Sequence, residues 1–248
     1  MITILLRGGL GNQLFQRAYG LALEHRGYQV VFNKSLLIEG THREYSLGIF
    51  GDLKMGEVQN PVICELDDNI LYKPDMLRPP DSRSIVGNWQ SEKYFADIAD
   101  KVRKAFIFPR PMLRHNSPTI ALHIRRQDYV GLQHFHGLPT LDYYRAAVEY
   151  ILTKMGPAMV FVFSDDRQWC RENLPADFRV VERTTKYEDL QMMAECTHIV
   201  TANSSFSWWA AWLGDNRSNS VVIAPKKWYT NPAMSDDGDL VPERWVKI

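Results

Sequence analysis

The chain has 248 residues, enough for one large domain or two compact halves, and its 45% hydrophobic and 23% charged residues are typical of a globular protein. Its 29 basic side chains are balanced by 29 acidic ones, so the net charge is zero. A general nucleic-acid binder needs a basic excess to neutralise backbone phosphates, so this class is excluded and any anion site must be local.

The cysteines and the apolar runs indicate the compartment. Cys64, Cys170 and Cys196 are far apart and form no CxxC pair, which argues against a disulfide framework or a zinc knuckle and favours a reducing cytoplasm. The first residues lack the features of a signal peptide, and no apolar run approaches the roughly 20 residues that span a bilayer. We expect a cytoplasmic protein with no transmembrane segment, and leave open a peripheral contact with the inner face of the membrane.

The first half of the chain opens with a predicted strand, turn, helix and strand. Residues 2–6 form a short apolar run, 8–12 form a glycine-rich turn, and 13–25 carry apolar side chains at helical spacing. A second strand is predicted over 28–32. This order is typical of the start of an α/β domain.

Three later segments of the first half are less regular. Residues 35–80 hold isolated turn signals without a periodicity that predicts an element. Residues 92–105 are predicted to be helical. The stretch 109–118 is rich in proline, and we interpret it as a hinge or domain boundary.

The second half alternates strands and helices. The predicted strands are 119–124, 159–163, 179–181, 198–201 and 221–223. The predicted helices lie near 140–154, 167–173, 187–195 and 205–213. This alternation predicts a parallel sheet with helices on both faces, and two such halves predict a ligand in the cleft between them. Ligands bind beyond the carboxyl ends of the strands in such sheets, so the residues directly after each strand are the candidates for a site.

The first of these strand exits carries two adjacent arginines, Arg125 and Arg126. His123 precedes them and faces the same side of the strand as Arg125. Guanidinium groups bind phosphate oxygens bidentately and stay charged at any working pH, so this pair is a candidate clamp for a diphosphate. The alternative is a surface ion-pair patch with Asp128.

The second exit carries Ser164, Asp165 and Asp166. A carboxylate at this place can accept the N–H donors of guanine or a ribose hydroxyl. The alternative is helix capping, because Ser and Asp are good N-caps for the helix after them. Both roles can hold for the group.

The third exit is polar and leads into an apolar helix. Asn203, Ser204, Ser205 and Phe206 stand at its start, where free backbone N–H groups and the positive end of the helix dipole suit a pyrophosphate. The helix itself is apolar on nearly all sides, which predicts burial. Its tryptophans at 208, 209 and 212 are expected to pack the core rather than contact a ligand.

The N-terminal glycine turn is similar to a dinucleotide fingerprint but departs from it. Leu14 stands where the third glycine is needed, and no acidic residue is found about 20 residues later. We interpret the turn as a close approach of the backbone to the ligand, with the amide of Asn12 presented there. The alternative is a tight strand-to-helix turn.

Three motifs together resemble one enzyme family. They are GGLGNQLF at 8–15, HIRRQDY at 123–129 and NSSFSWWAAWL at 203–213. They resemble the bacterial α-1,2-fucosyltransferases of glycosyltransferase family 11, and the likeness extends from residue 3 to Trp245. The arginine motif is shared with α-1,6- and protein O-fucosyltransferases, and the motif at 203–213 is more specific.

The resemblance implies an α/β fold of the GT-B type, with two Rossmann-like domains facing a cleft. We place an acceptor-side domain at 1–113 and a GDP-sugar-binding domain at 114–248. The implied reaction is inverting transfer of L-fucose from GDP-β-L-fucose to a terminal galactose hydroxyl of a glycan, in α-1,2 linkage. The implied partners are that donor and a galactose-terminated glycan acceptor, without a cofactor or a metal.

The resemblance also assigns roles to residues. Arg125 looks like the key phosphate-contacting group, supported by Arg126 and His123, and either Asp165 or Asp166 looks like the guanosine contact. Asn12 looks like the active-site asparagine facing fucose and acceptor. The remaining expected substrate-binding residues are Gly11, Asn203, Ser204, Ser205 and Phe206.

Two chemical questions stay open at this point. Asn12 can orient the acceptor hydroxyl but cannot act as a base, so Asp128, which we place among the catalytic residues, and His136 are candidates, unless a dissociative transition state needs no strong base. A metal is not expected, because the Asp-x-Asp spacing at 237–239 comes after no strand. Arg125 and the helix start must then stabilise the departing diphosphate.

Three other interpretations remain. The first is a fucosyltransferase of another linkage, because the arginine motif is shared. The second is a non-catalytic protein that binds a GDP-sugar on the same fold. A dinucleotide oxidoreductase is the third, and Leu14 argues against it.

Overall fold

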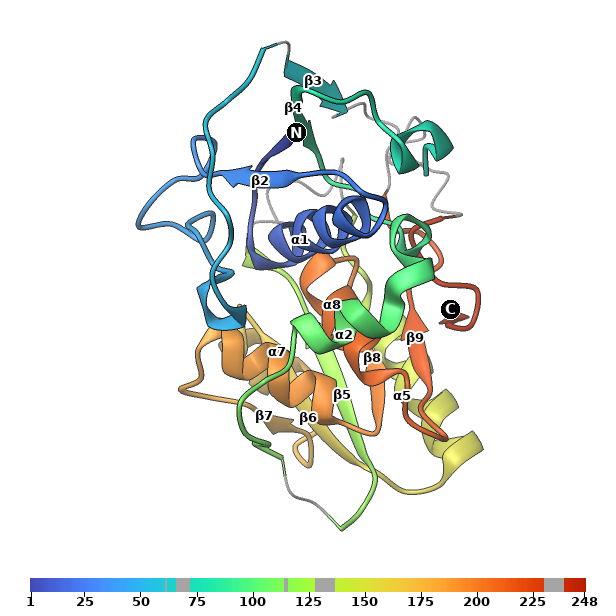
Figure 1. The fold of residues 1–248 in the computed structure, drawn as a ribbon. Helices are drawn as coiled ribbons and strands as arrows, with labels where there is room; N and C mark the ends of the chain where they lie inside the picture. The colour runs from blue at the N-terminus through green and yellow to red at the C-terminus, as the bar shows by residue number, and fades with distance from the viewer. Residues whose placement is uncertain (61, 66–71, 114–115, 128–136, 230–238) are drawn as a thin grey trace. The chain divides into compact units, whose positions relative to one another are not determined.

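The computed structural model describes residues 1–60, 62–65, 72–113, 116–127, 137–229 and 239–248 (Figure 1). The chain divides into two compact units. Unit 1 comprises Met1–Phe108 with Asp236–Pro242, and unit 2 comprises Pro109–Ser235 with Glu243–Ile248. Our division into 1–113 and 114–248 stays a prediction about folding domains.

Unit 1 is built on a four-stranded parallel sheet in the order β2-β1-β4-β3. The strands are β1 (Ile2–Leu5), β2 (Val30–Asn33), β3 (Val62–Glu65) and β4 (Arg83–Gly87). β1 is buried at every position, as expected for an apolar strand covered on both faces. β4 was not predicted, because its flanks gave only turn signals and its pairing with β1 is long-range.

The helix α1 (Leu10–His25) connects β1 to β2 and begins earlier than predicted. The prediction of a glycine-rich turn over 8–12 is therefore wrong for its second part, because Gly11 and Asn12 lie in the first helical turn. Leu10 and Leu14 stand one turn apart, and both are buried. They extend the apolar face of the helix to Leu10.

Short helical pieces complete unit 1. They are η1 (Gly48–Phe50), η2 (Pro74–Leu77), η3 (Glu92–Tyr94), η4 (Ala96–Ile98) and α2 (Ala99–Ala105). The single helix predicted over 92–105 is thus divided, because the buried Phe95 has a non-helical backbone. Its φ of −137° and ψ of 17° interrupt the helical hydrogen bonds.

Unit 2 holds a six-stranded sheet in the order β10-β9-β8-β5-β6-β7, and each pairing is parallel. The strands are β5 (Thr119–Ile124), β6 (Met159–Ser164), β7 (Arg179–Val180), β8 (His198–Val200), β9 (Val222–Ala224) and β10 (Val246–Lys247). Numbered from β5, the spatial order is 3-2-1-4-5-6, the arrangement of dinucleotide-binding folds. The alternation predicted from the sequence is confirmed, and β10 is an addition to it.

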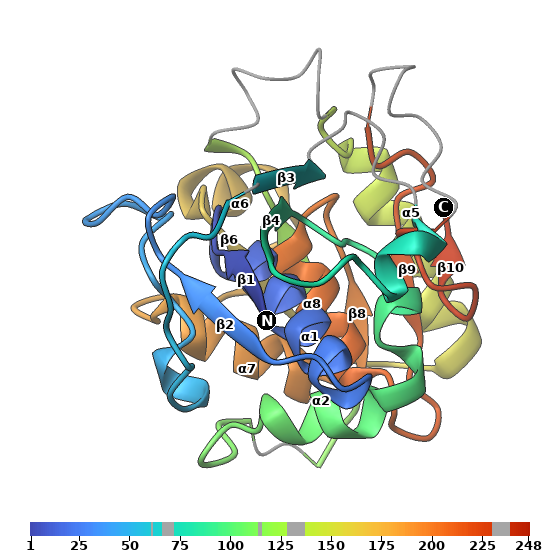
Figure 2. The same ribbon diagram turned by 45° about the horizontal axis from the view of Figure 1, so that its top comes forward.

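Helices cover both faces of this sheet (Figures 1 and 2). They are α5 (Leu141–Met155), α6 (Arg167–Asn173), α7 (Lys186–Glu195) and α8 (Ser205–Gly214). α7 and α8 pack together so closely that a Cβ on Gly214 would lie 2.6 Å from the carbonyl oxygen of Ala194. Glycine at this position therefore permits the close approach of the two helices.

No helix in the described part of the chain is both long enough and apolar enough to cross a membrane.

Candidate functional site

The strand order of unit 2 reverses between β5 and β8. The chain leaves β5 through α5 towards β6, and it leaves β8 through α8 towards β9 on the other side. Ligands bind at such a switch point, beyond the carboxyl ends of the two strands. The segments directly after β5 and β8 are the arginine pair and the polar start of α8.

The arginine pair is held by one carboxylate. Asp165 comes directly after β6 and lies 3.2 Å from Nε of Arg125, measured from its Oδ2. The same carboxylate accepts hydrogen bonds from the backbone N–H groups of Arg126, at 2.9 Å, and Gln127, at 3.3 Å. Asp165 therefore fixes the turn after β5 and orients the Arg125 guanidinium, a bracing role that the sequence did not indicate.

Arg126 interacts mainly with other side chains of unit 2. Its Nε lies 3.2 Å from Oδ2 of Asp166, and its guanidinium stacks 3.9 Å above the ring of Trp169. Asp166 is also the N-cap of α6, because its side chain accepts from the backbone N–H of Trp169. Ser164 accepts from the backbone N–H of Asp166 at 2.9 Å, so the capping alternative describes this exit well.

His123 connects the two strand exits. Its ring lies 5.7 Å from that of Phe206, and only 5% of the residue is exposed. Burial and the nearby charge of Arg125 lower the pKa of His123 to about 3, so the imidazole is neutral. Its Nδ1 has no hydrogen-bond partner within the described part of the chain. A neutral imidazole here leaves the positive charge of this exit to Arg125 and Arg126.

Acidification is expected to destabilise the protein through His123. Below its ordinary pKa of 6.5 the unfolded chain binds a proton that the native state, with a pKa of about 3, does not. The free energy of unfolding should then fall by about 1.4 kcal/mol per pH unit across this window. Urea unfolding at several pH values should give a flatter curve for His123→Asn than for the wild type. The exposed His25→Asn serves as control, and equal slopes for all three proteins would contradict the assignment.

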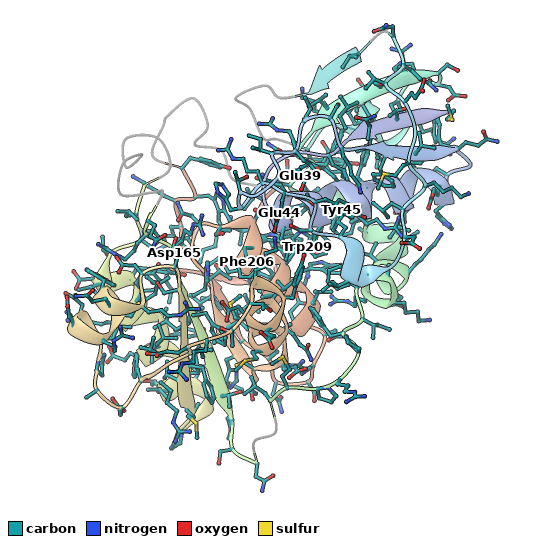
Figure 3. The ribbon with its side chains drawn as sticks, turned by 90° about the vertical axis from the view of Figure 1, so that its left-hand side faces the viewer. Glu39, Glu44, Tyr45, Asp165, Phe206 and Trp209 are labelled. Carbon is teal, nitrogen blue, oxygen red and sulfur yellow. The ribbon has the colours of Figure 1, made fainter. Side chains whose placement is uncertain are left out.

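The start of α8 presents N–H groups at the other exit. Ser204 is the N-cap, and its hydroxyl accepts from the backbone N–H of Phe206 at 3.3 Å. The remaining first-turn N–H groups of a helix lack intrahelical acceptors, and the dipole makes this end positive. Asn203 has a structural role, because its Nδ2 donates hydrogen bonds to the carbonyls of Trp228 and Gly137. Asp165 and Phe206 lie along the same edge of unit 2 (Figure 3).

The tryptophans of α8 are buried. Trp208, Trp209 and Trp212 are at most 1% exposed, and their rings contact one another. Trp208 also contacts Trp245, with ring centroids 5.5 Å apart. The expected packing role is confirmed by this burial.

In unit 1, the predicted site residues lie at the exit of β1. Gly11 is buried in the first turn of α1, and Asn12 is partly exposed beside it. The Oδ1 of Asn12 accepts a hydrogen bond of 2.8 Å from Nε2 of Gln90. Sequence reasoning missed Gln90, because β4, the strand that places it there, was not recognised.

Two buried glutamines of α1 were also missed. The Gln13 side chain donates to the carbonyls of Gly8 and Glu44 and accepts from Ser46. Gln16 bonds both backbone groups of Arg7 and the carbonyl of Gly87. A buried polar residue inside an apolar helical face was the available signal, since burial requires such partners. These bonds fix the backbone around the exits of β1 and β4.

Some predicted residues lie outside the described part of the chain. Asp128 and the alternative base His136 are among them, as is most of the Asp-x-Asp segment at 237–239. Asp239 is described, accepts from the backbone N–H of Tyr72 and pairs with Lys93. Among the residues that the structure places, no three His, Cys, Asp or Glu side chains are grouped as metal ligands would be.

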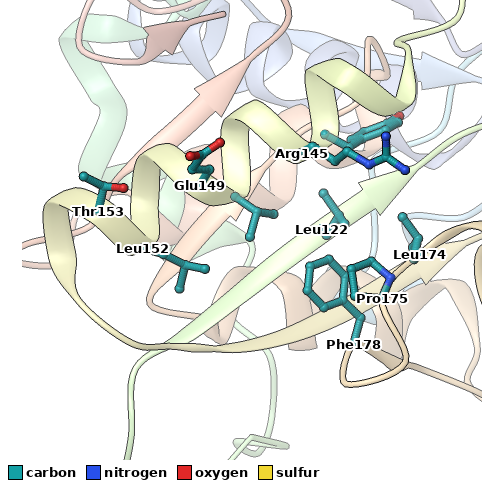
Figure 4. A pocket seen from close by; sticks show the side chains of 10 residues that line it. Leu122, Arg145, Glu149, Leu152, Thr153, Leu174, Pro175 and Phe178 are labelled. Carbon is teal, nitrogen blue, oxygen red and sulfur yellow. The ribbon is translucent and has the colours of Figure 1, made fainter.

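A cavity of about 380 Å³ opens elsewhere in unit 2, between α5 and the segment after α6 (Figure 4). Its lining is mostly apolar and includes Leu122, Val148 and Phe178, with Arg145 and Glu149 also present. The two arginines after β5 and the first turn of α8 are not part of it. It is therefore separate from the candidate diphosphate site.

The fold and the cationic switch point define a class. Parallel α/β units with an arginine pair and a helix N-terminus at one switch point are suited to bind a ligand that carries phosphate groups. The solved structure of the E. coli heptosyltransferase WaaC with ADP is similar to this chain, with a TM-score of 0.54 and 10% identity. The similarity covers 99% of this chain and 92% of that one, and it supports the predicted fold class.

The family is established by the sequence comparison. The family model described as glycosyl transferase family 11 matches residues 81–248, and the chain belongs to this family. It is 29% identical to an α-1,2-colitosyltransferase of Escherichia coli over 100% of this chain and 99% of the relative. It is also 33% identical to the O-antigen biosynthesis glycosyltransferase WbnK of E. coli, over 56% of this chain and 47% of the relative. A galactoside 2-α-L-fucosyltransferase of Caenorhabditis elegans is 25% identical over the whole chain and 79% of the relative.

Proposed function

We propose that this glycosyltransferase transfers L-fucose from GDP-β-L-fucose to a terminal galactose hydroxyl of a glycan, with inversion to an α-1,2 linkage. The observation that carries the proposal is the Arg125 guanidinium, which Asp165 orients at the switch point of unit 2. The names of the two relatives that match over the whole chain support the linkage, because both describe transfer of a sugar to a 2-position.

The proposed chemistry is a consequence of charge. Breaking the bond between the sugar C1 and the phosphate oxygen leaves negative charge on GDP and an oxocarbenium-like sugar. Arg125 and the first-turn N–H groups of α8 are proposed to stabilise that charge, in place of a metal ion. The acceptor oxygen then bonds to C1 from the opposite face and its proton passes to a base or to water. Equal activity with and without EDTA is the expected result for a metal-independent reaction.

Colitosyl transfer is a second candidate. One relative that matches over nearly its full length is named an α-1,2-colitosyltransferase. Colitose differs from L-fucose by the absence of one hydroxyl. A hydrophobic pocket that fits the deoxy sugar discriminates poorly against a sugar with one extra hydroxyl, whereas a site that hydrogen-bonds this hydroxyl rejects the deoxy sugar strongly. The two donors can therefore be separated by their kcat/KM ratio.

The deciding experiment offers GDP-fucose and GDP-colitose separately with a panel of β-galactosides, and NMR then identifies the product. We expect acceptor-dependent release of GDP from GDP-fucose and a product substituted at the 2-hydroxyl of galactose. A higher kcat/KM with GDP-colitose would replace the donor assignment. A product of another linkage would replace the regiochemistry. GDP-sugar binding without acceptor-dependent release would instead indicate a non-catalytic binding protein.

A further inference from the structure

The strand order of unit 1 also reverses, between β1 and β4. These strands are hydrogen-bonded neighbours, although the chain visits β2 on one side and β3 on the other between them. The groups directly after them are the first turn of α1 and the segment from Asn88 to Gln90. A ligand of this unit is expected at this point.

The groups at this switch point are mainly amides. Asn12, Asn88 and Gln90 all carry side-chain carboxamides, which donate to and accept from hydroxyl groups without adding charge. Arg7 also lies after β1 and adds one charged side chain, and its backbone N–H and carbonyl are both bonded by Gln16. Three carboxamides beside one arginine suit a ligand rich in hydroxyl groups, such as the acceptor glycan, whereas the arginine pair of unit 2 suits a diphosphate.

One hydrogen bond sets the direction of the Asn12 amide. Nε2 of Gln90 donates to Oδ1 of Asn12 at 2.8 Å, and Gln90 is only 8% exposed. The oxygen of Asn12 therefore faces Gln90, and its Nδ2 group points elsewhere. The Trp89 backbone before Gln90 has a φ of 46°, which is uncommon for a bulky residue. Such a backbone persists only where its surroundings hold it in place.

Gly8 makes room for the other end of the same amide. A Cβ on Gly8 would lie 2.5 Å from Nδ2 of Asn12, closer than real Cβ contacts come. Gly8 also has a φ of 72°, which favours glycine. The Asn12 amide is therefore fixed from two sides, with its oxygen on Gln90 and its nitrogen above Gly8.

We propose that Gln90 is a positioning residue, which holds the Asn12 amide so that its N–H group, and not its oxygen, is presented to a hydroxyl of the acceptor sugar. This inference rests on the proposed function, since it assigns the neutral ligand of unit 1 as the acceptor. Asn12 then donates to an oxygen lone pair of the acceptor and takes no proton from it.

The test reverses the amide. The carboxylate introduced by Gln90→Glu can only accept hydrogen bonds. The Asn12 amide must therefore turn over, so that its nitrogen faces the carboxylate and its oxygen occupies the former position of the nitrogen. We expect kcat/KM for the galactoside to fall about 10–100-fold, whereas the Kd of GDP changes less than about twofold. Asn12→Asp, which keeps an acceptor for Gln90 but offers no donor, should lose a similar factor. Gln59→Glu, a partly buried glutamine of the same unit, is the control and should behave as the wild type.

Coupling and binding separate this role from a loss of stability. Gln90→Glu should add no further loss in an Asn12→Ala background, because both changes remove one interaction. Galactoside binding, measured by saturation-transfer NMR, should weaken in Gln90→Glu and persist in Gln59→Glu. This measurement tests the inference independently of catalytic activity. Unchanged kcat/KM and galactoside binding in Gln90→Glu would overturn it. A wild-type protein that binds the galactoside but transfers no sugar would instead overturn the proposed function.

Discussion

Arg125→Ala is expected to lower kcat by about 10²–10³-fold or more, because the group that stabilises the charge of the departing diphosphate is removed. In the wild type, Asp165 lies 3.2 Å from the Arg125 guanidinium. When Arg125 is truncated, Asp165 still accepts hydrogen bonds from the backbone N–H groups of Arg126 and Gln127. The fold should therefore survive, and the loss should appear mainly in turnover. The measurement is steady-state GDP release with GDP-fucose and a galactoside at saturating concentrations.

Two companion variants sharpen this result. Arg125→Lys keeps the charge but not the planar fork that suits phosphate oxygens, so it should recover only part of the lost rate. Arg171→Ala removes an exposed arginine of the same unit that pairs with Glu182, and it should keep wild-type turnover. If Arg125→Ala turns over at close to the wild-type rate with either donor, its assignment to the diphosphate is wrong.

Trp208→Ala is expected to destabilise unit 2 by about 3–5 kcal/mol, as truncation of a large buried aromatic side chain does. Trp208 is 0% exposed, and its ring lies 5.2 Å from Trp209 and 5.5 Å from Trp245. Truncation of the indole leaves a cavity beside these two rings, and such a cavity adds to the loss of buried apolar surface. The loss is measured as a shift in the urea unfolding midpoint.

A surface variant provides the comparison for Trp208. Leu152 lies on α5 with 36% of its surface exposed, and Leu152→Ala should cost less than about 1 kcal/mol. Trp208→Phe keeps an aromatic ring and should lie between the two. A loss below about 1 kcal/mol for Trp208→Ala would mean that the indole does not support the core and is free for another role.

The elements of unit 2 could be predicted because local signals agreed with the tertiary structure. The run from Met159 to Phe163 is apolar at every position, as a strand buried on both faces requires, and it forms β6. Thr185 and Glu188 form a capping box at the start of α7, and Ser204 caps α8. These bounds locate the strand exits, so Arg125 and the start of α8 were found from the sequence.

Unit 1 was less predictable because its structure depends on long-range pairing. The last four residues of β4 are buried, and the strand pairs with β3 and with β1, which lies far away along the chain. No periodicity distinguishes such a strand from a turn region. Without β4 the position of Gln90 could not be known, and neither could its bond to Asn12.

Local patterns in the sequence were sufficient to predict the class of fold, the positions of the arginine pair and the polar helix start, and a family resemblance that the comparisons confirm. These are local properties, because hydrophobic periodicity, caps and motifs are written in neighbouring residues. Three features required the three-dimensional structure: which exits share a switch point, the orientation of Arg125 by Asp165, and the direction of the Asn12 amide set by Gln90. Strand pairing and side-chain hydrogen bonds join residues that are far apart in the chain, so local sequence patterns do not predict them.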